Sequence, residues 1–311
     1  MSNGFHTPVL LESVIKYLIS TTDGIYIDAT IGGGGHAEAI LEHLSSRAKL
    51  VGFDADSDAI EYASRKLARY HHQITLIREN FTQMKFCLQQ NDIDKIDGAL
   101  FDLGVSSFQL NEPNKGFSFQ RDERLDMRMD KRLKLDAAAL VTSAERRKLE
   151  TIFWEYGEER LARKIANAIV RERARKPLYT GVSLAALIEQ VVGKKFARKS
   201  MARVFQALRI EVNDELNNLR QALHDAIELL KKGGRIVVIS YHSLEDRIVK
   251  DFFRSEAADT LSSGHKLVQD VQRVPRLKVI TRKPVRPSEE EIRTNRRARS
   301  AKLRAAERVG L

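Results

Sequence analysis

Several acidic and polar side chains stand where short apolar runs end, which is where α/β proteins bind their ligands. Asp28, Asp54 and Asp102 each lie at the end of such a run, and Tyr241 and His242 follow another. In an open α/β sheet the ligand lies outside the carboxyl ends of the strands. A carboxylate there can accept hydrogen bonds from ribose hydroxyls or from an amine, or balance a cationic ligand. These five residues are therefore the first candidates for chemistry.

Four consecutive glycines, residues 32–35, follow the first of these aspartates and lead into a helical pattern. Glycines allow positive φ and let a ligand approach the backbone closely, and the helix that follows presents free N–H groups. The run therefore predicts a nucleotide-binding turn. Because Gly32-x-Gly34-x-x-Ala37 also satisfies the dinucleotide fingerprint, the turn alone leaves a nicotinamide cofactor open.

The acid before the turn favours a different cofactor. Asp28-x-Thr30-x-Gly32-x-Gly34 resembles the Asp-x-Gly-x-Gly-x-Gly signature of class I S-adenosylmethionine-dependent methyltransferases, with threonine at the first glycine position. A pyrophosphate avoids a neighbouring carboxylate, whereas the sulfonium and amino groups of S-adenosylmethionine are attracted to one. Asp54, 22 residues after Gly32, is predicted to bind the ribose hydroxyls. Methyl transfer is thus the favoured reaction.

Asp102 indicates what is methylated. It begins the run Asp-Leu-Gly-Val-Ser-Ser at the end of the fourth predicted strand, where amino-methyltransferases hold an acid or an amide beside the target amine. The Pro-Pro-aromatic that usually follows is absent, so the ring that stacks on the base stays open among Phe108, Phe117 and Phe119. Methylation of a pyrimidine carbon 5 needs a cysteine at a strand end, and Cys87 is not predicted at one. An exocyclic amine or a hydroxyl remains as the target.

Strand and helix patterns alternate around these residues up to position 103. This alternation predicts βαβ units and a doubly wound parallel sheet with helices on both faces. From about residue 108 to 212 the pattern is helical only. The predicted fold class is α/β, a class I methyltransferase (Rossmann-like) doubly wound sheet with an inserted helical domain. The expected strands are 25–29, 50–54, 74–78, 96–103 and 235–240. One helix is expected to begin at residue 35, and the others are expected at 58–70, 82–90, 144–156, 159–173, 183–192, 202–210 and 214–232. Gly233 and Gly234 are expected to end the last of these helices.

These patterns also predict the domain boundaries. A methyltransferase domain in two parts would enclose an inserted basic domain for substrate recognition, and a basic tail would follow. Short strands near 266–271 and 277–281 would complete the sheet with partly antiparallel pairing. The four parts are 1–107, 108–212, 213–285 and 286–311.

Composition limits the class of protein. No apolar run approaches the length that spans a bilayer, and no signal-peptide pattern begins the chain, so a cytoplasmic protein with no membrane partner is expected. The single cysteine excludes an internal disulfide, and its apolar neighbours favour a packing role. Nothing in the sequence indicates an oligomeric state.

Charge is unevenly distributed along the 311 residues, whose net charge is +11. Residues 1–108 carry 9 lysines and arginines against 14 acids, whereas 109–212 carry 23 against 14 and 273–311 carry 13 against 4. An acidic body with two basic appendages is typical of a protein that docks on a polyanion. Nucleic acid is therefore the predicted partner, and the arginine-rich tail at 293–308 is expected to bind its phosphates.

Motifs spread along most of the chain agree with one known family. They are residues 6–12, 28–36, 102–107, 116–119, 125–130, 156–160, 205–209, 240–247 and 297–300. Together they resemble the bacterial 16S ribosomal RNA cytosine-N4 methyltransferase family. The resemblance implies N4 methylation of a cytidine in the P-site decoding region of 16S rRNA in the small ribosomal subunit, with S-adenosylmethionine as cofactor. The cofactor contacts that it implies are Gly34, Gly35, His36, Asp54, Phe81, Asp102 and Gln109, to which the turn adds Asp28.

Transfer to cytosine N4 needs acceptors for its hydrogens, because its lone pair is delocalised into the ring. Asp102 is the first candidate for this catalytic role, with His242 or Tyr241 in second place. Two other classes stay open. A non-catalytic ribosome-assembly protein would keep the basic surfaces and tolerate loss of Asp102, and a nicotinamide-dependent dehydrogenase would bind NAD in the same turn.

Overall fold

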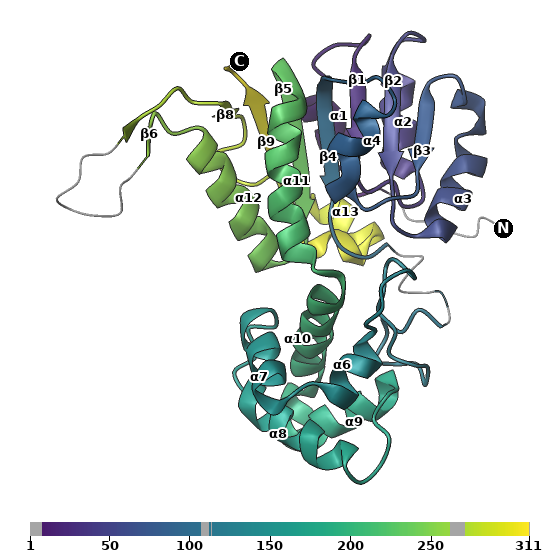
Figure 1. The fold of residues 1–311 in the computed structure, drawn as a ribbon, viewed down its shortest axis with the longest axis vertical. Helices are drawn as coiled ribbons and strands as arrows, with labels where there is room; N and C mark the ends of the chain where they lie inside the picture. Colours follow the sequence, from purple (N-terminus) through teal and green to yellow (C-terminus); the bar gives the residue numbers. More distant parts are fainter. Residues whose placement is uncertain (1–7, 107–111, 113, 262–270, 311) are drawn as a thin grey trace. The chain divides into compact units, whose positions relative to one another are not determined.

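The computed structural model describes residues 8–106, 112, 114–261 and 271–310, and the chain folds into two compact units (Figure 1). One unit joins Met1–Gly104 to Leu216–Leu311, and the other is Val105–Glu215. Each has a hydrophobic core of its own. Within the described ranges, no helix has both the length and the apolar character needed to cross a bilayer.

The first unit is built on a seven-stranded sheet in the order β3-β2-β1-β4-β5-β9-β8. Its first five strands are parallel to one another, which confirms the predicted doubly wound α/β sheet. Strand β9 is antiparallel to both of its neighbours. A separate antiparallel pair joins β6 (Thr260–Leu261) and β7 (Val271–Gln272). The strands of the large sheet are β1 (Ile25–Asp28), β2 (Lys49–Phe53), β3 (Ile74–Ile77), β4 (Ile96–Asp102), β5 (Leu230–Ser240), β8 (Leu277–Val279) and β9 (Lys302–Arg308).

Helices cover both faces of this sheet, because its central strands are apolar on both sides (Figure 1). In β1, Tyr26 packs in the core with α1, α2 and α3, and Ile27 packs in the core with α4, α11 and α12. Helices α1, α12 and α13 were not among the expected elements. The helices are α1 (Leu11–Leu18), α2 (Gly35–His43), α3 (Ser57–Lys66), α4 (Met84–Gln89), α11 (Glu215–Leu229), α12 (Ser243–Glu256) and α13 (Glu289–Thr294), with 3-10 turns at Ala68–Tyr70, Phe81–Gln83 and Arg296–Ser300.

The second unit is helical, and its described residues contribute no strand of the sheets. Buried faces of its helices meet in one core that includes Phe153, Ile165 and Leu208. All four helices expected between 144 and 210 are present, although the last is twice as long as its pattern suggested. The helices are α6 (Ala137–Ser143), α7 (Arg146–Glu155), α8 (Ala162–Arg173), α9 (Gly181–Val192) and α10 (Lys194–Asn213).

The C-terminal segment is not the free basic tail that the sequence suggested at 286–311. Strand β9 lies inside the sheet, between β5 and β8. Its Leu303 and Ala305 pack in one core and Ala306 in the other. Arg304 is buried and its Nε donates to Oδ1 of Asp246 at 2.6 Å. Lys302 and Arg304 therefore stabilise the fold through Asp246 instead of forming an arm for phosphates, and truncation at 293–308 would remove a strand from inside the sheet.

Gly233 and Gly234 also differ from their expected role as a helix end. Helix α11 stops at Leu229, and β5 begins at once with Leu230. The pairing of β5 with β4 shifts register before Arg235, and Gly233 has φ of 82°. The glycines thus allow an irregular stretch within a long strand.

Substitution of Arg304 by alanine is expected to lower the free energy of unfolding by about 1.5–3 kcal/mol, because Asp246 would lose a buried charged hydrogen bond. Lys302, 3.0 Å from the same carboxylate, limits the loss. Urea denaturation followed by circular dichroism measures it. The exposed Arg299→Ala is the matched control, and equal losses in the two variants would contradict a structural role for β9.

Candidate functional site

The carboxyl ends of the parallel strands bring the predicted site residues to one edge of the sheet. Asp28 is the last residue of β1, and Asp102 is the last of the neighbouring β4. Asp54 directly follows β2, and Tyr241 directly follows β5. Phe81 opens the 3-10 turn that comes after β3. Residues separated by more than 200 positions thus share one edge.

The glycine turn between β1 and α2 requires glycine for two separate reasons. Gly32 (φ 48°) and Gly34 (φ 72°) have left-handed backbone, which other residues adopt only with strain. At Gly35, a β-carbon would lie 2.9 Å from Cγ of Pro8, so a side chain there would clash. No described side chain caps α2 at Gly34. The turn therefore offers bare backbone at the positive end of a helix, as a nucleotide cradle does.

Asp54 holds the turn in place. Its Oδ2 accepts from the N–H of Gly32 at 3.0 Å, and its Oδ1 accepts from the N–H of Asp56 at 2.9 Å. Both carboxylate oxygens are therefore oriented by backbone groups. A carboxylate oxygen has two lone pairs, so the same group has the capacity to accept from a ligand hydroxyl.

Asp28 is a buried acid of the site with a strongly raised pKa. Its carboxylate is 1% exposed and accepts from the N–H of Thr30 at 3.2 Å. Burial raises its pKa to about 7, and the charges of Asp102 and Asp54 add to that rise, while His36 opposes it. Three carboxylates thus share a region where a positive charge would be stabilised.

Thr30, which stands at the first glycine position of the Asp-x-Gly-x-Gly-x-Gly signature, has a structural role. Its hydroxyl oxygen accepts from the N–H of Asp102 at 2.7 Å, which ties the end of β1 to the end of β4. A glycine at this position could not make that bond. The threonine therefore helps to fix the position of Asp102 without disturbing the glycine turn.

Asp102 is held from two sides. The hydroxyl of Tyr241 donates to its Oδ1 at 2.8 Å, and Nδ1 of His36 lies 3.5 Å from its Oδ2. Burial and the charge of Asp102 keep the pKa of Tyr241 well above its usual value, so the phenol stays a donor. Nε2 of His36 lies 3.0 Å from the carbonyl oxygen of Val9, and it carries a proton because a carbonyl only accepts. The carboxylate of Asp102 remains partly open, with 22% of the side chain exposed.

The contact of His36 with Asp102 was not predicted. The available signal was its place as the second residue of α2, from which a ring can reach the end of an adjacent strand. Tyr241, placed second with His242, proves to be the closer partner of Asp102.

His242 has a structural position at the N-terminus of α12. Its Nδ1 accepts from the N–H of Glu245 at 3.4 Å, and Nε2 lies 3.1 Å from the carboxylate of the same residue. Glu245 Oε2 accepts in return from the N–H of His242 at 3.3 Å, and it also accepts from the N–H of Tyr241 at 2.8 Å. The two side chains form a capping box, and this box fixes the backbone of Tyr241.

The aromatic candidates have different surroundings. Phe81 stands half-buried at the site edge, with its ring edge-on to Phe101 at 5.8 Å. Phe117 is buried in the core of the helical unit, and Phe119 packs against Phe205 in the same unit. Phe108 and Gln109 lie outside the described residues. Half-buried Cys87 packs against a core of the first unit, and burial raises its pKa, in agreement with the packing interpretation.

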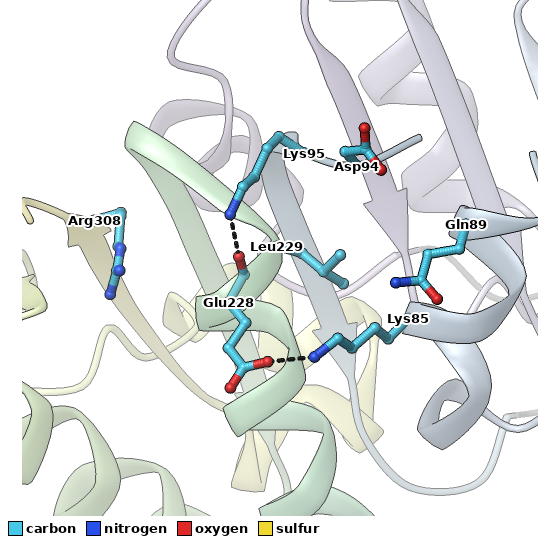
Figure 2. Close-up of a pocket in the computed structure, with 7 residues that line it drawn as sticks. All are labelled: Lys85, Gln89, Asp94, Lys95, Glu228, Leu229 and Arg308. Atoms are coloured by element: carbon cyan, nitrogen blue, oxygen red, sulfur yellow. Dashed lines mark hydrogen bonds and ion pairs between the residues drawn. The ribbon is translucent and has the colours of Figure 1, made fainter. Parts of the chain in front are cut away.

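A pocket of about 380 Å³ lies away from this edge, near the start of β4 and the end of α11 (Figure 2). Its lysines are already occupied, because Lys85 donates to the Glu228 carboxylate and Lys95 to the Glu228 carbonyl oxygen. The pocket is therefore not part of the candidate ligand site at the glycine turn. Its lining residues are Lys85, Gln89, Asp94, Lys95, Glu228, Leu229 and Arg308.

The fold and the glycine-turn site define a class I, Rossmann-like methyltransferase. The MraW methylase family matches residues 3–309, and the chain belongs to that family. Relatives named "Ribosomal RNA small subunit methyltransferase H" include one from Carboxydothermus hydrogenoformans, 49% identical over 98% of both chains, and one from Clostridioides difficile, 43% identical over 98% of this chain and 99% of its own. A solved structure of a putative rRNA methylase from Clostridium thermocellum shows 14% identity and a TM-score of 0.44, over 96% of this chain and 93% of that one.

Asp28→Asn is expected to stabilise the protein at alkaline pH. The pKa of Asp28 is about 7 in the folded chain against an ordinary value of 3.8, so the ionised carboxylate costs stability as pH rises from about 4 to 7. At pH 8 the variant should be more stable by about 1–3 kcal/mol, and at pH 4 the gain should vanish. Urea denaturation at both values measures this, with the exposed Asp94→Asn as control. A variant that is less stable at pH 8 would contradict the burial argument.

Proposed function

We propose that this chain transfers a methyl group from S-adenosylmethionine to N4 of a cytidine in the P-site decoding region of 16S ribosomal RNA. The protein is an S-adenosylmethionine-dependent ribosomal RNA methyltransferase, as its relatives at 43–49% identity over nearly their full length are named for small-subunit rRNA methylation. The observation that carries the choice of an amine is the partly open Asp102 carboxylate, held by Tyr241 at the end of β4.

The residues of the turn suit this cofactor. S-adenosylmethionine supplies a methyl group made electrophilic by its sulfonium. The negative region of Asp28, Asp54 and Asp102 favours a cationic ligand and disfavours the pyrophosphate of a dinucleotide. The dehydrogenase alternative is set aside because this negative region disfavours a pyrophosphate and because the chain belongs to a methylase family. The proposed contacts are Gly34, Gly35 and His36 at the turn, Asp54 on the ribose, Phe81 on the adenine, and Asp102 and Gln109 towards the methionine.

Asp102 is the proposed catalytic residue. Its carboxylate would accept a hydrogen of N4, which favours the pyramidal, charge-developing nitrogen of the transition state. Tyr241 orients Oδ1 through its hydroxyl, and Nδ1 of His36 lies 3.5 Å from Oδ2. His242 enters the proposal as a positioning residue, because it acts through the capping box that fixes Tyr241.

The inserted unit is the proposed substrate-recognition domain. Its 109–212 stretch carries 23 lysines and arginines against 14 acids. A base in a structured RNA must leave its stack to reach a cofactor, and cationic surfaces that grip the flanking phosphates hold the strand while this happens.

The proposal is tested with methyl-labelled S-adenosylmethionine, small ribosomal subunits or naked 16S rRNA, and nucleoside analysis of the product. Asp102→Ala is expected to reduce kcat by roughly 10²–10⁴-fold, because the acceptor for the N4 hydrogens is lost. Tyr241→Phe, which removes one oriented hydrogen bond, should cost less. His242→Asn keeps a capping side chain and should retain most activity. Full activity of Asp102→Ala would contradict the assignment, and label absent from cytidine N4 would favour the assembly-protein alternative or a different target.

Binding of S-adenosylmethionine is expected to strengthen as pH rises towards 7 and then level off. A cation beside Asp28 favours its ionised form, so binding below its pKa of about 7 must release a proton. Affinity should change by up to about tenfold per pH unit between pH 5 and 7. Titration calorimetry at pH 6 in two buffers of different ionisation enthalpy measures the released proton. Asp28→Asn should remove the dependence; its persistence in that variant would assign the proton to another group.

A further inference from the structure

The start of α10 gathers positive charge without acids. Residues 194–209 contain six lysines and arginines and no aspartate or glutamate. Arg203 lies 3.7 Å from Glu159, whereas Lys194, Arg198 and Lys199 have no acidic partner in the described part of the chain. The exposed cations, here called the basic face of α10, are Lys194, Lys195, Arg198, Lys199 and Arg203.

Helix energetics disfavour this arrangement. The pairs Lys194–Arg198, Lys195–Lys199 and Lys199–Arg203 place like charges four residues apart, where they repel. Four of the cations lie in the first two turns, at the positive end of the helix dipole, with no acid in the first turn and no side-chain cap. By contrast, α12 begins with Glu245 and Asp246, as the dipole favours. A sequence that breaks a local rule without internal compensation marks a functional surface.

The opposite side of α10 explains why these cations point outward together. Ala197, Val204 and Leu208 are buried in the core of the helical unit. The basic face therefore forms one stripe of about 14 Å along the helix, at 1.5 Å per residue. A stripe of this length can follow several phosphates of one nucleic-acid strand.

An exposed aromatic ring lies within the same two turns. Phe196 is 56% exposed, although large apolar side chains of helical units are usually buried. Nζ of Lys195 lies 5.6 Å from the centre of its ring. Cations that follow a backbone, with a ring on which a base can stack, form the usual surface for single-stranded nucleic acid.

We propose that the basic face of α10 binds the phosphate backbone of the substrate RNA and that Phe196 stacks on one unpaired base beside it. This inference rests on the proposed function, since it names the surface by which that function holds its RNA. An acidic protein surface would also attract these charges, but an RNA strand matches the row of cations and the adjacent exposed ring at once.

The test replaces Lys194, Lys195, Arg198 and Lys199 together by alanine in the full chain. Filter binding to 16S rRNA transcribed in vitro, between 50 and 300 mM KCl, is expected to show at least tenfold weaker binding at 100 mM. The slope of log affinity against log salt should fall by about 3, from four lost cations. The thermal midpoint should not decrease, because repulsion is removed; a decrease would assign the cations to stability and overturn the inference.

A matched control removes the same charge elsewhere. Lys232, Lys278, Arg282 and Lys283 are exposed residues of the other unit, and their joint replacement by alanine should change the salt slope by less than 1. Equal losses in the two variants would show a general charge effect and overturn the inference. Phe196→Ala should weaken binding at least threefold at every salt concentration, whereas Phe196→Tyr should not.

Binding and product formation are separate readouts. If the native chain binds the RNA through this face but leaves cytidine N4 unmethylated, the proposed function fails and the surface stands. If N4 is methylated and the α10 variant binds normally, only the surface fails.

Discussion

The main physical constraint on the site is the electrostatic cost of keeping three carboxylates, those of Asp28, Asp54 and Asp102, together at one edge of a parallel sheet. Asp28 is fully enclosed, and burial and the charges of Asp102 and Asp54 all oppose its ionisation. Such a region is unfavourable in the free protein unless a positive charge enters it. A ligand that brings a sulfonium and an ammonium would relieve this cost, so in the proposed site the feature that weakens the fold would also favour a cationic cofactor.

The surrounding structure is arranged to hold these carboxylates at fixed distances. Asp54 is engaged by two backbone N–H groups, one of them from the glycine turn. Asp102 is positioned by its own N–H on Thr30 and by the phenol of Tyr241. Donors that are already oriented in the free protein reduce the reorganisation needed in a transition state. The proposed site is thereby distributed over the ends of β1, β2, β4 and β5.

Much of this arrangement could be predicted from sequence. The parallel strands are buried on both faces and appear in the sequence as short apolar runs, and the glycine turn marks the end of β1. The sheet and its ligand-binding edge could therefore be predicted from the sequence. Strand β9 could not be predicted, because its basic residues resemble those of a solvated tail. Only the structure shows that Lys302 and Arg304 both pair with Asp246. The contact of Tyr241 with Asp102 could not be assigned because it follows from strand order, whereas the contact of His36 had as its signal the place of this residue at the start of α2. His242 could have been identified as a cap, because Glu245 stands three residues after it.

Burial and its acidic neighbours hold the pKa of Asp28 at about 7, and in the proposed site the cationic cofactor would lower it. Carboxyl ¹³C chemical shifts of labelled aspartate, followed from pH 4 to 9 with and without S-adenosylmethionine, test it directly, and Asp28→Asn assigns the signal. A midpoint of about 7 is expected for Asp28 in the free protein, with a fall of at least two pH units in the complex. A midpoint near 4 in the free protein, or one that the cofactor leaves unchanged, would contradict it.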